Sequence, residues 1–195
     1  MGQWWAIVPF RADAAKSRLS SFPAAQRAEL ARSFARDTAK AALACPEVSG
    51  VLVVGDDTGL EGIDTVADPG GGLNAALSWA ALRIPPGHGA VALMADLPAL
   101  RTDELTRALR AAADHGRSFV CDAEGTGTTM LASRTPHDLG PRFGLRSRAA
   151  HAASGARELE IADAPGLRRD VDDAVALWDA VRLGVGIDTR RALEA

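Results

Sequence analysis

The chain has 195 residues, with 22 Lys and Arg against 25 Asp and Glu, which gives a formal net charge of −3. This length predicts one domain over residues 1–195 with a full hydrophobic core. Because the chain has no basic tract and no apolar stretch near the roughly 20 residues of a membrane span, we expect no nucleic-acid or membrane partner. Cys45 and Cys121 form no metal-ligand pattern, and we expect both thiols to be reduced in a cytoplasmic protein.

The first predicted element is a strand over residues 4–8, and the loop after it carries three cations. These cations are Arg11, Lys16 and Arg18. Lysine offers a point charge and arginine a forked donor to phosphate oxygens, so the loop suits an anionic ligand. A solvated surface loop explains the same residues equally well.

A helix is predicted over residues 23–44, where Leu30 and Phe34 share one face and a proline stands near each end. Mainly β-branched residues then predict a strand over 51–54, and a further short strand is expected at 65–67. The helix is expected to be structural, and Asp56 and Asp57 after the strand over 51–54 could touch a ligand, although acidic residues at a solvent-facing strand end need no such reason.

A glycine-rich turn, Gly70, Gly71 and Gly72, leads through Asn74 into a predicted helix over residues 75–82. Such a turn lets a ligand approach bare backbone, and the helix N-terminus adds N–H donors, which favours a phosphate, a ribose or a base edge. The Asn74 amide offers a donor and an acceptor that can read a base or a sugar. The turn is neither a Walker A loop nor a dinucleotide fingerprint, and a flexible connector is the alternative.

Residues 91–94 predict a buried strand, and Asp96 stands at its carboxyl tip before Pro98 turns the chain outward. In an open α/β sheet ligands bind beyond the carboxyl ends of the strands, so a carboxylate there can hold a divalent cation. An aspartate that merely opens the turn is the alternative. The next helix is predicted to start with Thr102 as its cap and to run to about Asp114.

Two further strands are predicted at residues 118–121 and 129–131. Glycine and threonine alternate between them, from Gly125 to Thr128. Alternating backbone donors and hydroxyls suit a small oxyanion, and an ordinary hairpin turn is the alternative.

The last third of the chain is expected to hold two more helices. Ser147 is expected to cap a helix over residues 148–154, with His151 as a half-buried surface histidine. Asp170 and Asp172 alternate in an extended approach to the last long helix, so one of them is expected to face a site, although helix capping explains at least one carboxylate without a metal. The apolar residues expected to give that helix a core face are Val175, Leu177, Trp178, Val181 and Leu183.

These strands, mostly separated by helices or glycine-rich loops, predict a three-layer α/β/α fold with a mainly parallel sheet. Cations in the first loop, glycines before a helix, and the carboxylates of Asp96 and Asp170 fit a nucleoside triphosphate with Mg²⁺, which prefers one or two carboxylates plus phosphate oxygens. No Ser-His-Asp or Cys-His set competes with this interpretation. An attacking group that is itself an anionic phosphate would need no general base.

Short motifs follow one another over essentially the whole chain. They are Val8-Pro9 with Lys16-Ser17-Arg18-Leu19, Asp68-Pro69-Gly70-Gly71-Gly72-Leu73-Asn74, Ala95-Asp96-Leu97-Pro98, Gly125-Thr126-Gly127-Thr128-Thr129, Phe143-Gly144-Leu145-Arg146-Ser147 with His151 and Gly155-Ala156, and Arg169-Asp170-Val171-Asp172. Each motif is short, but the ordered set resembles the guanylyltransferases of coenzyme F420 biosynthesis, which act on 2-phospho-L-lactate or phosphoenolpyruvate. The resemblance implies a glycosyltransferase-A-like nucleotidyltransferase fold that joins GTP to a three-carbon phosphorylated acid and releases pyrophosphate.

The resemblance also implies roles for charged residues. Asp96 and Asp170 would hold Mg²⁺, and Lys16 and Arg18 would neutralise the triphosphate. The acceptor's phosphate oxygen would attack the α-phosphorus of GTP in line. The product would pass to the next transferase of F420 assembly.

For binding, the resemblance implies that the glycine-rich turn takes the guanosine and that Thr129, Gly144 and Ser147 bind phosphoenolpyruvate or 2-phospho-L-lactate. Phe10 stands where many relatives have lysine, and Arg11 is expected to replace it as a phosphate contact.

Two alternatives stay open at this stage. A cytidylyl- or molybdopterin-guanylyl-type transferase would share the fold, but its typical Leu-Ala-Gly-Gly opening loop is missing from the sequence. A non-catalytic nucleotide-binding regulator would keep the glycine-rich turn without needing Asp96, Asp170 and Lys16 together. The acceptor stays open among phosphoenolpyruvate, phospholactate and phosphoglycerate, and so does the oligomeric state.

Overall fold

The centre of the molecule is a seven-stranded sheet in the order β3-β2-β1-β4-β6-β5-β7. The computed structural model describes residues 3–12, 19 and 21–195. The strands are β1 (Trp4–Phe10), β2 (Val48–Gly55), β3 (Asp64–Val66), β4 (Gly89–Leu93), β5 (Arg117–Cys121), β6 (Thr128–Ser133) and β7 (Arg157–Glu158). Neighbouring strands are parallel except where β6 pairs with β4 and β5. The mainly parallel sheet is therefore confirmed, and the two-residue β7, too short to show a period, is an addition.

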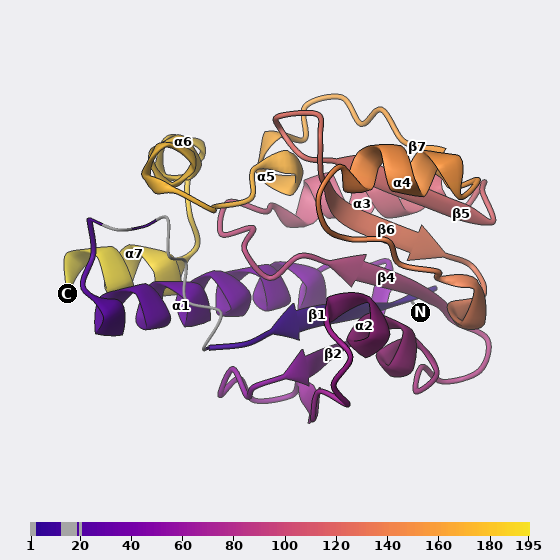
Figure 1. Cartoon of the computed structure of the whole chain (residues 1–195), viewed down its shortest axis with the longest axis horizontal. Helices are drawn as coiled ribbons and strands as arrows, with labels where there is room; N and C mark the ends of the chain where they lie inside the picture. The colour runs from indigo at the N-terminus through magenta and orange to yellow at the C-terminus, as the bar shows by residue number, and fades with distance from the viewer. Residues whose placement is uncertain (1–2, 13–18, 20) are drawn as a thin grey trace.

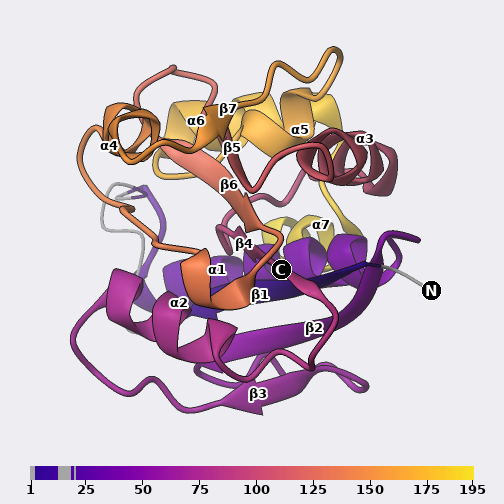
Figure 2. The same cartoon turned by 90° about the vertical axis from the view of Figure 1, so that its right-hand side faces the viewer.

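Helices cover both faces of this sheet (Figures 1 and 2). They are α1 (Ala24–Leu43), α2 (Leu73–Ala81), α3 (Thr102–Ala112), α4 (Ser147–Ala153), α5 (Pro165–Arg168), α6 (Ala174–Leu183) and α7 (Ile187–Glu194), with a 3₁₀ turn at Pro136–Asp138. Helices α1 and α3 pack on one face, and α2 and α4 on the other. The three-layer α/β/α prediction is confirmed. None of the helices in the described part of the chain is long and apolar enough to cross a membrane.

Strand β1 shows why the sheet needs helices on both faces. Ala6 and Val8 point into the core under α1 and α3, whereas Ile7 between them points into the core under α2. Successive side chains of a strand point to opposite faces, so a run of apolar residues buries both.

The end of the chain differs from the prediction. Helix α6 is followed by α7, which was not predicted and packs along α1, where the buried carboxylate of Asp37 accepts hydrogen bonds from the N–H groups of Asp188 (3.1 Å) and Thr189 (2.9 Å). The predicted core face of α6 is wrong for most of its residues. Leu177 is buried, but these four are exposed: Val175, Trp178, Val181 and Leu183. Helix α6 contacts the core through a narrow stripe that includes two alanines, so its larger side chains are left outside.

Two predicted helix caps are also corrected. Thr102 and Ser147 are the first residues of α3 and α4, and the capping positions belong to Arg101 and Arg146. The Thr102 hydroxyl donates instead to the carbonyl of Ala41 on α1. A tertiary contact therefore takes the side chain that the local pattern assigned to the cap.

Gly166 allows α5 to approach the loop before α3. Its N–H donates to Glu104 Oε1 (3.1 Å), and a Cβ atom at this position would lie 2.0 Å from the carbonyl oxygen of Ala99. We expect Gly166→Ala to lower the free energy of unfolding by about 1–3 kcal/mol, because backbone has to move to relieve the clash. Urea denaturation measures the change. Gly116→Ala is the matched control, since a Cβ there meets nothing within 4 Å, and equal losses in the two variants would contradict the explanation.

Candidate active site

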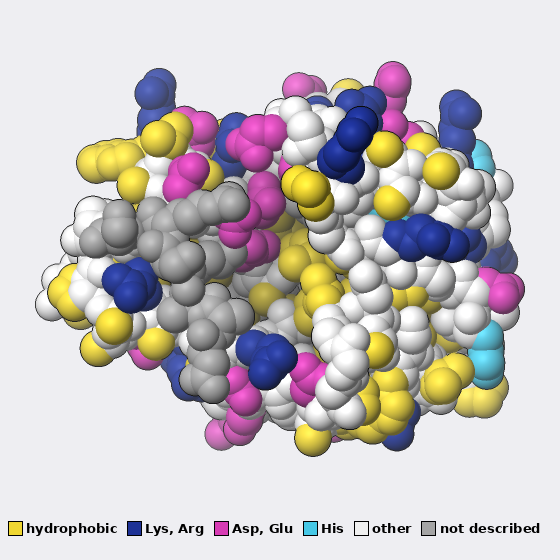
Figure 3. All heavy atoms as spheres, in the orientation of Figure 1, with side chains coloured by type: hydrophobic (Ala, Val, Ile, Leu, Met, Phe, Trp, Pro, Cys, Tyr) yellow, Lys and Arg dark blue, Asp and Glu magenta, His cyan; other side chains and the backbone are white. Residues whose placement is uncertain are grey.

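A cavity of about 290 Å³ lies at the edge of the sheet where β1, β2 and β4 end. Figure 3 shows this hollow with apolar side chains on its floor and charged side chains at its rim. Its lining residues are Pro9, Phe10, Arg11, Ala31, Val54, Asp68, Leu73, Ala76, Met94, Ala95 and Asp96. The carboxyl ends of parallel strands are the usual place for a ligand in an open α/β sheet, as predicted for Asp96.

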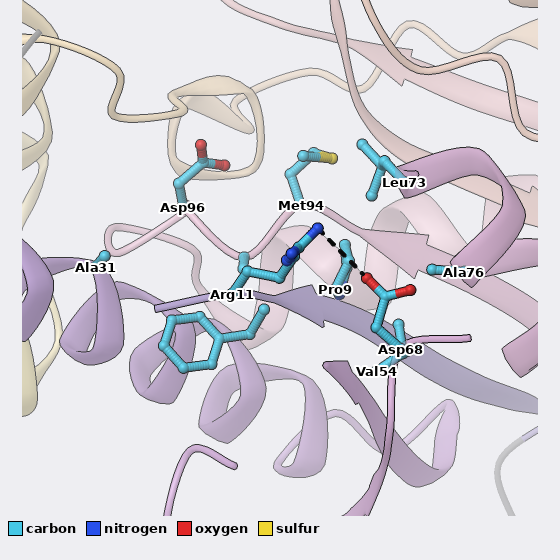
Figure 4. Close-up of a pocket in the computed structure, with 11 residues that line it drawn as sticks. Pro9, Arg11, Ala31, Val54, Asp68, Leu73, Ala76, Met94 and Asp96 are labelled. Carbon is cyan, nitrogen blue, oxygen red and sulfur yellow. Dashed lines mark ion pairs between the residues drawn. The ribbon is translucent and has the colours of Figure 1, made fainter. Parts of the chain in front are cut away.

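Arg11 and the glycine-rich turn meet at this cavity. Arg11 Nη1 lies 3.8 Å from Asp68 Oδ2, and Figure 4 shows the two side chains pointing toward each other. Asp68 Oδ1 accepts a hydrogen bond from the Gly70 N–H at 2.8 Å. The structure thus joins the loop after β1 to the turn before α2, two segments that the sequence predicted separately as nucleotide contacts.

The three glycines of the turn are required by their backbone angles. Gly70, Gly71 and Gly72 have φ values of 87°, 81° and 87°, a region that residues with a Cβ rarely adopt. Gly72 stands at the N-terminal cap of α2. The glycine-rich turn therefore presents backbone without side chains, and the first turn of α2 presents its N–H groups, beside the cavity.

Asp96 follows β4 and lines the cavity from the end opposite Asp68 (Figure 4). Its backbone is held on two sides. Its carbonyl accepts from the Val171 N–H at 2.9 Å, and the next N–H, of Leu97, donates to Thr38 Oγ1 on α1 at 3.2 Å. The contact with Val171 brings Asp96 beside Asp170.

Asp170 is partly buried and lies among other carboxylates. Burial, followed by the negative charges of Asp96, Asp172 and Asp122, raises the pKa of Asp170 to about 7. Asp172 is exposed, and the N-cap of α6 is Asp173, whose Oδ1 accepts from the Ala176 N–H at 2.9 Å. Capping therefore accounts for Asp173 and leaves Asp170 as the residue that faces the acidic cluster.

Two members of this cluster were missed by the sequence reasoning. Asp122, Glu124 and Asp170 can each offer a carboxylate oxygen within 4.8 Å of the others. Asp122 accepts from the N–H groups of Thr126 (2.8 Å) and Gly127 (2.7 Å), and Glu124 forms an ion pair with Arg169 at 3.0 Å. Asp122 comes directly after a buried strand, and Asp96 comes three residues after another. This position at a strand end could have identified Asp122 as a site residue from the sequence. Asp122, Glu124 and Asp170, together with the cavity residue Asp96, are the candidates for holding a cation.

The residues predicted for the acceptor lie on two neighbouring segments. Thr129 is buried at the start of β6, and its carbonyl accepts from the N–H of the cavity residue Met94 at 3.0 Å. Gly144 lies on the loop that enters α4, and Ser147 is the first residue of α4, where its N–H donates to the Gly144 carbonyl at 3.1 Å. The prediction that these residues contact the acceptor stays a prediction.

His151 joins these two segments. Its Nδ1 lies 2.9 Å from Thr128 Oγ1, and its Nε2 accepts from the Arg142 N–H at 2.9 Å. The ring also packs against Phe119 and Phe143, with centroids 5.7 Å and 5.0 Å away. The expected half-buried surface histidine is wrong, because the side chain is fully buried by residues distant in the sequence.

The burial of His151 predicts a pH dependence of stability. Burial, then the charges of Arg117 and Arg142, lowers the pKa of His151 from 6.5 to about 4. The unfolded chain takes up a proton below pH 6.5 and the folded chain does not until about pH 4, so stability falls as the pH decreases through this range. We expect this residue to remove up to about 3 kcal/mol of unfolding free energy. Denaturation of wild type and His151→Gln between pH 7 and pH 4.5 measures the difference, and identical pH slopes would rule out this assignment.

Asn74 has a role that the sequence did not reveal. Its Nδ2 donates to the Phe143 carbonyl at 2.9 Å, and its Oδ1 accepts from the Phe143 N–H at 2.8 Å. The amide joins the start of α2 to the loop that carries Gly144 and leads into α4 at Ser147. The predicted catalytic residues Lys16 and Arg18 lie outside the described residues.

No protein-family model matches the chain. Curated relatives do match it over nearly its full length. The chain is 49% identical to the phosphoenolpyruvate guanylyltransferase of Streptomyces coelicolor, with 94% of this chain and 92% of that protein covered. It is 48% identical to the phosphoenolpyruvate guanylyltransferase of Salinispora arenicola, with 94% and 90% covered.

Solved structures share the fold at lower identity. A 4-diphosphocytidyl-2C-methyl-D-erythritol synthase superimposes with a TM-score of 0.64 at 11% identity, covering 94% of this chain and 99% of that one. Rv0371c of Mycobacterium tuberculosis, in a complex with manganese, gives a TM-score of 0.60 at 21% identity, covering 100% and 99%. At these identities the likeness shows an α/β nucleotidyltransferase fold and no more.

Proposed function

The chain belongs to the phosphoenolpyruvate guanylyltransferase family, and from this premise we propose that it transfers a guanylyl group from GTP to phosphoenolpyruvate. The identity of 49% over 94% of the chain carries the proposal. The cavity at the carboxyl edge of the sheet agrees with it, since it combines an apolar floor with a glycine-rich turn, an arginine and acidic residues.

The nucleotide is proposed to bind on the Arg11 side of the cavity. The positive φ values of Gly70, Gly71 and Gly72 expose backbone N–H groups that suit a ribose or a phosphate. The Arg11 guanidinium is well exposed beside them, where it can reach phosphate oxygens. The apolar floor, which includes Val54 and Leu73, suits the flat face of a base.

The acidic residues fit a divalent cation, and we propose Mg²⁺. Burial, followed by the negative charges of Asp96, Asp172 and Asp122, raises the pKa of Asp170 to about 7, and Asp170 can offer an oxygen within 4.8 Å of those of Asp122 and Glu124. Hard oxygen donors kept together at such a cost suit a hard cation. When bound, Mg²⁺ would neutralise charge on the phosphates. Asp96 and Asp170 are its proposed ligands, and Asp122 supports them from the turn after β5.

The reaction needs little acid–base chemistry from the chain. A phosphate oxygen of the acceptor attacks the α-phosphorus of GTP, the bond from the α-phosphorus to the bridging oxygen breaks, and pyrophosphate leaves. The attacking oxygen is already anionic, so no residue has to remove a proton. The proposed work of the protein is positioning and charge neutralisation, with Lys16 and Arg18 acting on the triphosphate and Thr129, Gly144 and Ser147 on the acceptor.

We further propose that the product passes to a downstream transferase of coenzyme F420 assembly and that the setting is the cytoplasm. The two thiols, Cys45 and Cys121, are free and buried, which suits a reducing compartment.

Pyrophosphate release by the purified protein tests the function. The assay contains Mg²⁺ and GTP, with phosphoenolpyruvate, 2-phospho-L-lactate or 3-phosphoglycerate in separate reactions and a downstream F420-assembly transferase to draw off an unstable product. We expect release with phosphoenolpyruvate. Release with CTP instead of GTP would favour a cytidylyl transferase, and binding of GTP without release from any acid would favour a nucleotide-binding regulator.

A further inference from the structure

The Phe143 backbone is held by one side chain through both of its polar groups. Asn74 Nδ2 donates to the Phe143 carbonyl at 2.9 Å, and the Phe143 N–H donates to Asn74 Oδ1 at 2.8 Å. The two residues are 69 positions apart in the sequence. Only a side chain with a donor and an acceptor on the same group can make this pair, and an amide meets that requirement.

The same loop is also held by His151, which lies on α4. The Arg142 N–H donates to His151 Nε2 at 2.9 Å, so two successive backbone N–H groups each donate to a side chain from a different helix. Immediately after them, Gly144 has a φ of 131° and Arg146 has a φ of 58°. A segment with two such backbone angles is costly to order, and the side-chain bonds on its first residues fix where it begins.

The position of Asn74 gives these bonds a functional meaning. Asn74 is the second residue of α2, directly after the glycine-rich turn and between cavity-lining residues Leu73 and Ala76. Phe143 directly precedes Gly144, and the loop then leads into α4, whose first residue is Ser147. The cavity wall formed by α2 and the loop that carries Gly144, a proposed contact of the acceptor, are therefore connected through one amide group.

We propose that Asn74 is a positioning residue for the acceptor: by holding both polar groups of Phe143, it fixes the Gly144–Ser147 segment from the nucleotide side of the cavity. This inference rests on the proposed transfer from GTP to phosphoenolpyruvate. In this proposal Asn74 affects binding of the acceptor indirectly, through Phe143. The alternative is that Asn74 contacts the base of GTP directly.

Two variants separate these roles. Asn74→Leu removes both hydrogen bonds, and Asn74→Asp keeps the acceptor for the Phe143 N–H but loses the donor to its carbonyl. At saturating GTP we expect the KM for phosphoenolpyruvate to rise about tenfold or more in Asn74→Leu and less in Asn74→Asp, since buried backbone groups lose their partners. Binding of GTP alone, measured by calorimetry, is expected to stay within about threefold of wild type, because the amide is engaged with Phe143.

Ser78→Ala is the matched control. The Ser78 hydroxyl donates to the Asn74 carbonyl at 2.9 Å from an exposed position one turn further along α2, so this variant changes the helix but not the bonds to Phe143. We expect it to keep the wild-type KM for both substrates.

The outcomes are distinguishable. Wild type that releases no pyrophosphate would refute the proposed function itself. Active wild type together with an unchanged phosphoenolpyruvate KM in both Asn74 variants would refute this inference alone, and so would a loss of GTP binding with the acceptor KM unchanged. A variant that only folds less well would have a smaller active fraction and a lower melting temperature but an unchanged KM. That result would also contradict a positioning role for Asn74.

Discussion

Replacing Asp96 by asparagine is expected to lower turnover by at least about a hundredfold while the protein stays folded. Asp96 lines the cavity, its carbonyl is bonded to the N–H of Val171 next to Asp170, and its carboxylate is a proposed ligand of the cation that would neutralise the triphosphate. Asparagine keeps the size of the side chain. The backbone bonds from Val171 and Leu97, which position this segment, involve no Asp96 side-chain atom and are retained. Steady-state release of pyrophosphate measures the loss, and the melting temperature reports the fold.

Asp57→Asn provides the comparison for that experiment. Asp57 also follows a strand at the same edge of the sheet, but its side chain is exposed and accepts a local hydrogen bond from the Gly59 N–H at 2.8 Å. We expect it to keep turnover within about twofold, because a screened surface charge contributes little. Wild-type turnover in a correctly folded Asp96→Asn protein would refute the role proposed for this carboxylate.

The position of Asp96 could be predicted because it depends on local pattern. A buried apolar strand ends near it, and in a parallel sheet that end faces the ligand side. The glycine-rich turn was predictable for a similar reason, since three successive glycines at a strand-to-helix connection indicate backbone angles that other residues avoid. In both cases the residues that allow the prediction lie within about ten positions of each other in the sequence.

The rest of the acidic cluster could not be found in this way. Asp122 follows β5, and Asp170 lies beside the segment that follows β4. The ends of these two strands lie at the same edge because β6 stands between them in the sheet and is antiparallel to both. Strand order is a tertiary property, and no period in the sequence encodes it. His151 was assigned to the surface for the same reason, since the residues that bury it, Phe119 and Phe143, come from another strand and another loop.

Asp170→Asn is expected to separate stability from activity. The pKa of Asp170 is about 7 in the folded protein, against 3.8 for an ordinary aspartate. The folded state thus binds this proton more tightly than the unfolded state does, so the wild type loses stability as the pH rises from about 4 to about 7. Asparagine carries no such cost. At pH 8 and without metal we expect the variant to be more stable than wild type by about 1–3 kcal/mol, with the difference vanishing near pH 4.

Activity should move in the opposite direction in the same protein. With Mg²⁺ and both substrates, Asp170→Asn is expected to lose at least about a hundredfold in turnover. A metal that binds the folded state raises the melting temperature by mass action, so the rise that Mg²⁺ or Mn²⁺ gives the wild type should be smaller in this variant. Asp114→Asn, at an exposed position just after α3, is the control, and we expect small changes in all three measurements. A gain in metal-free stability together with full activity would mean that Asp170 is buried for a reason other than the cation. A loss of metal-free stability at pH 8 would contradict the raised pKa, because removing an unfavourably buried charge cannot destabilise the fold through that charge.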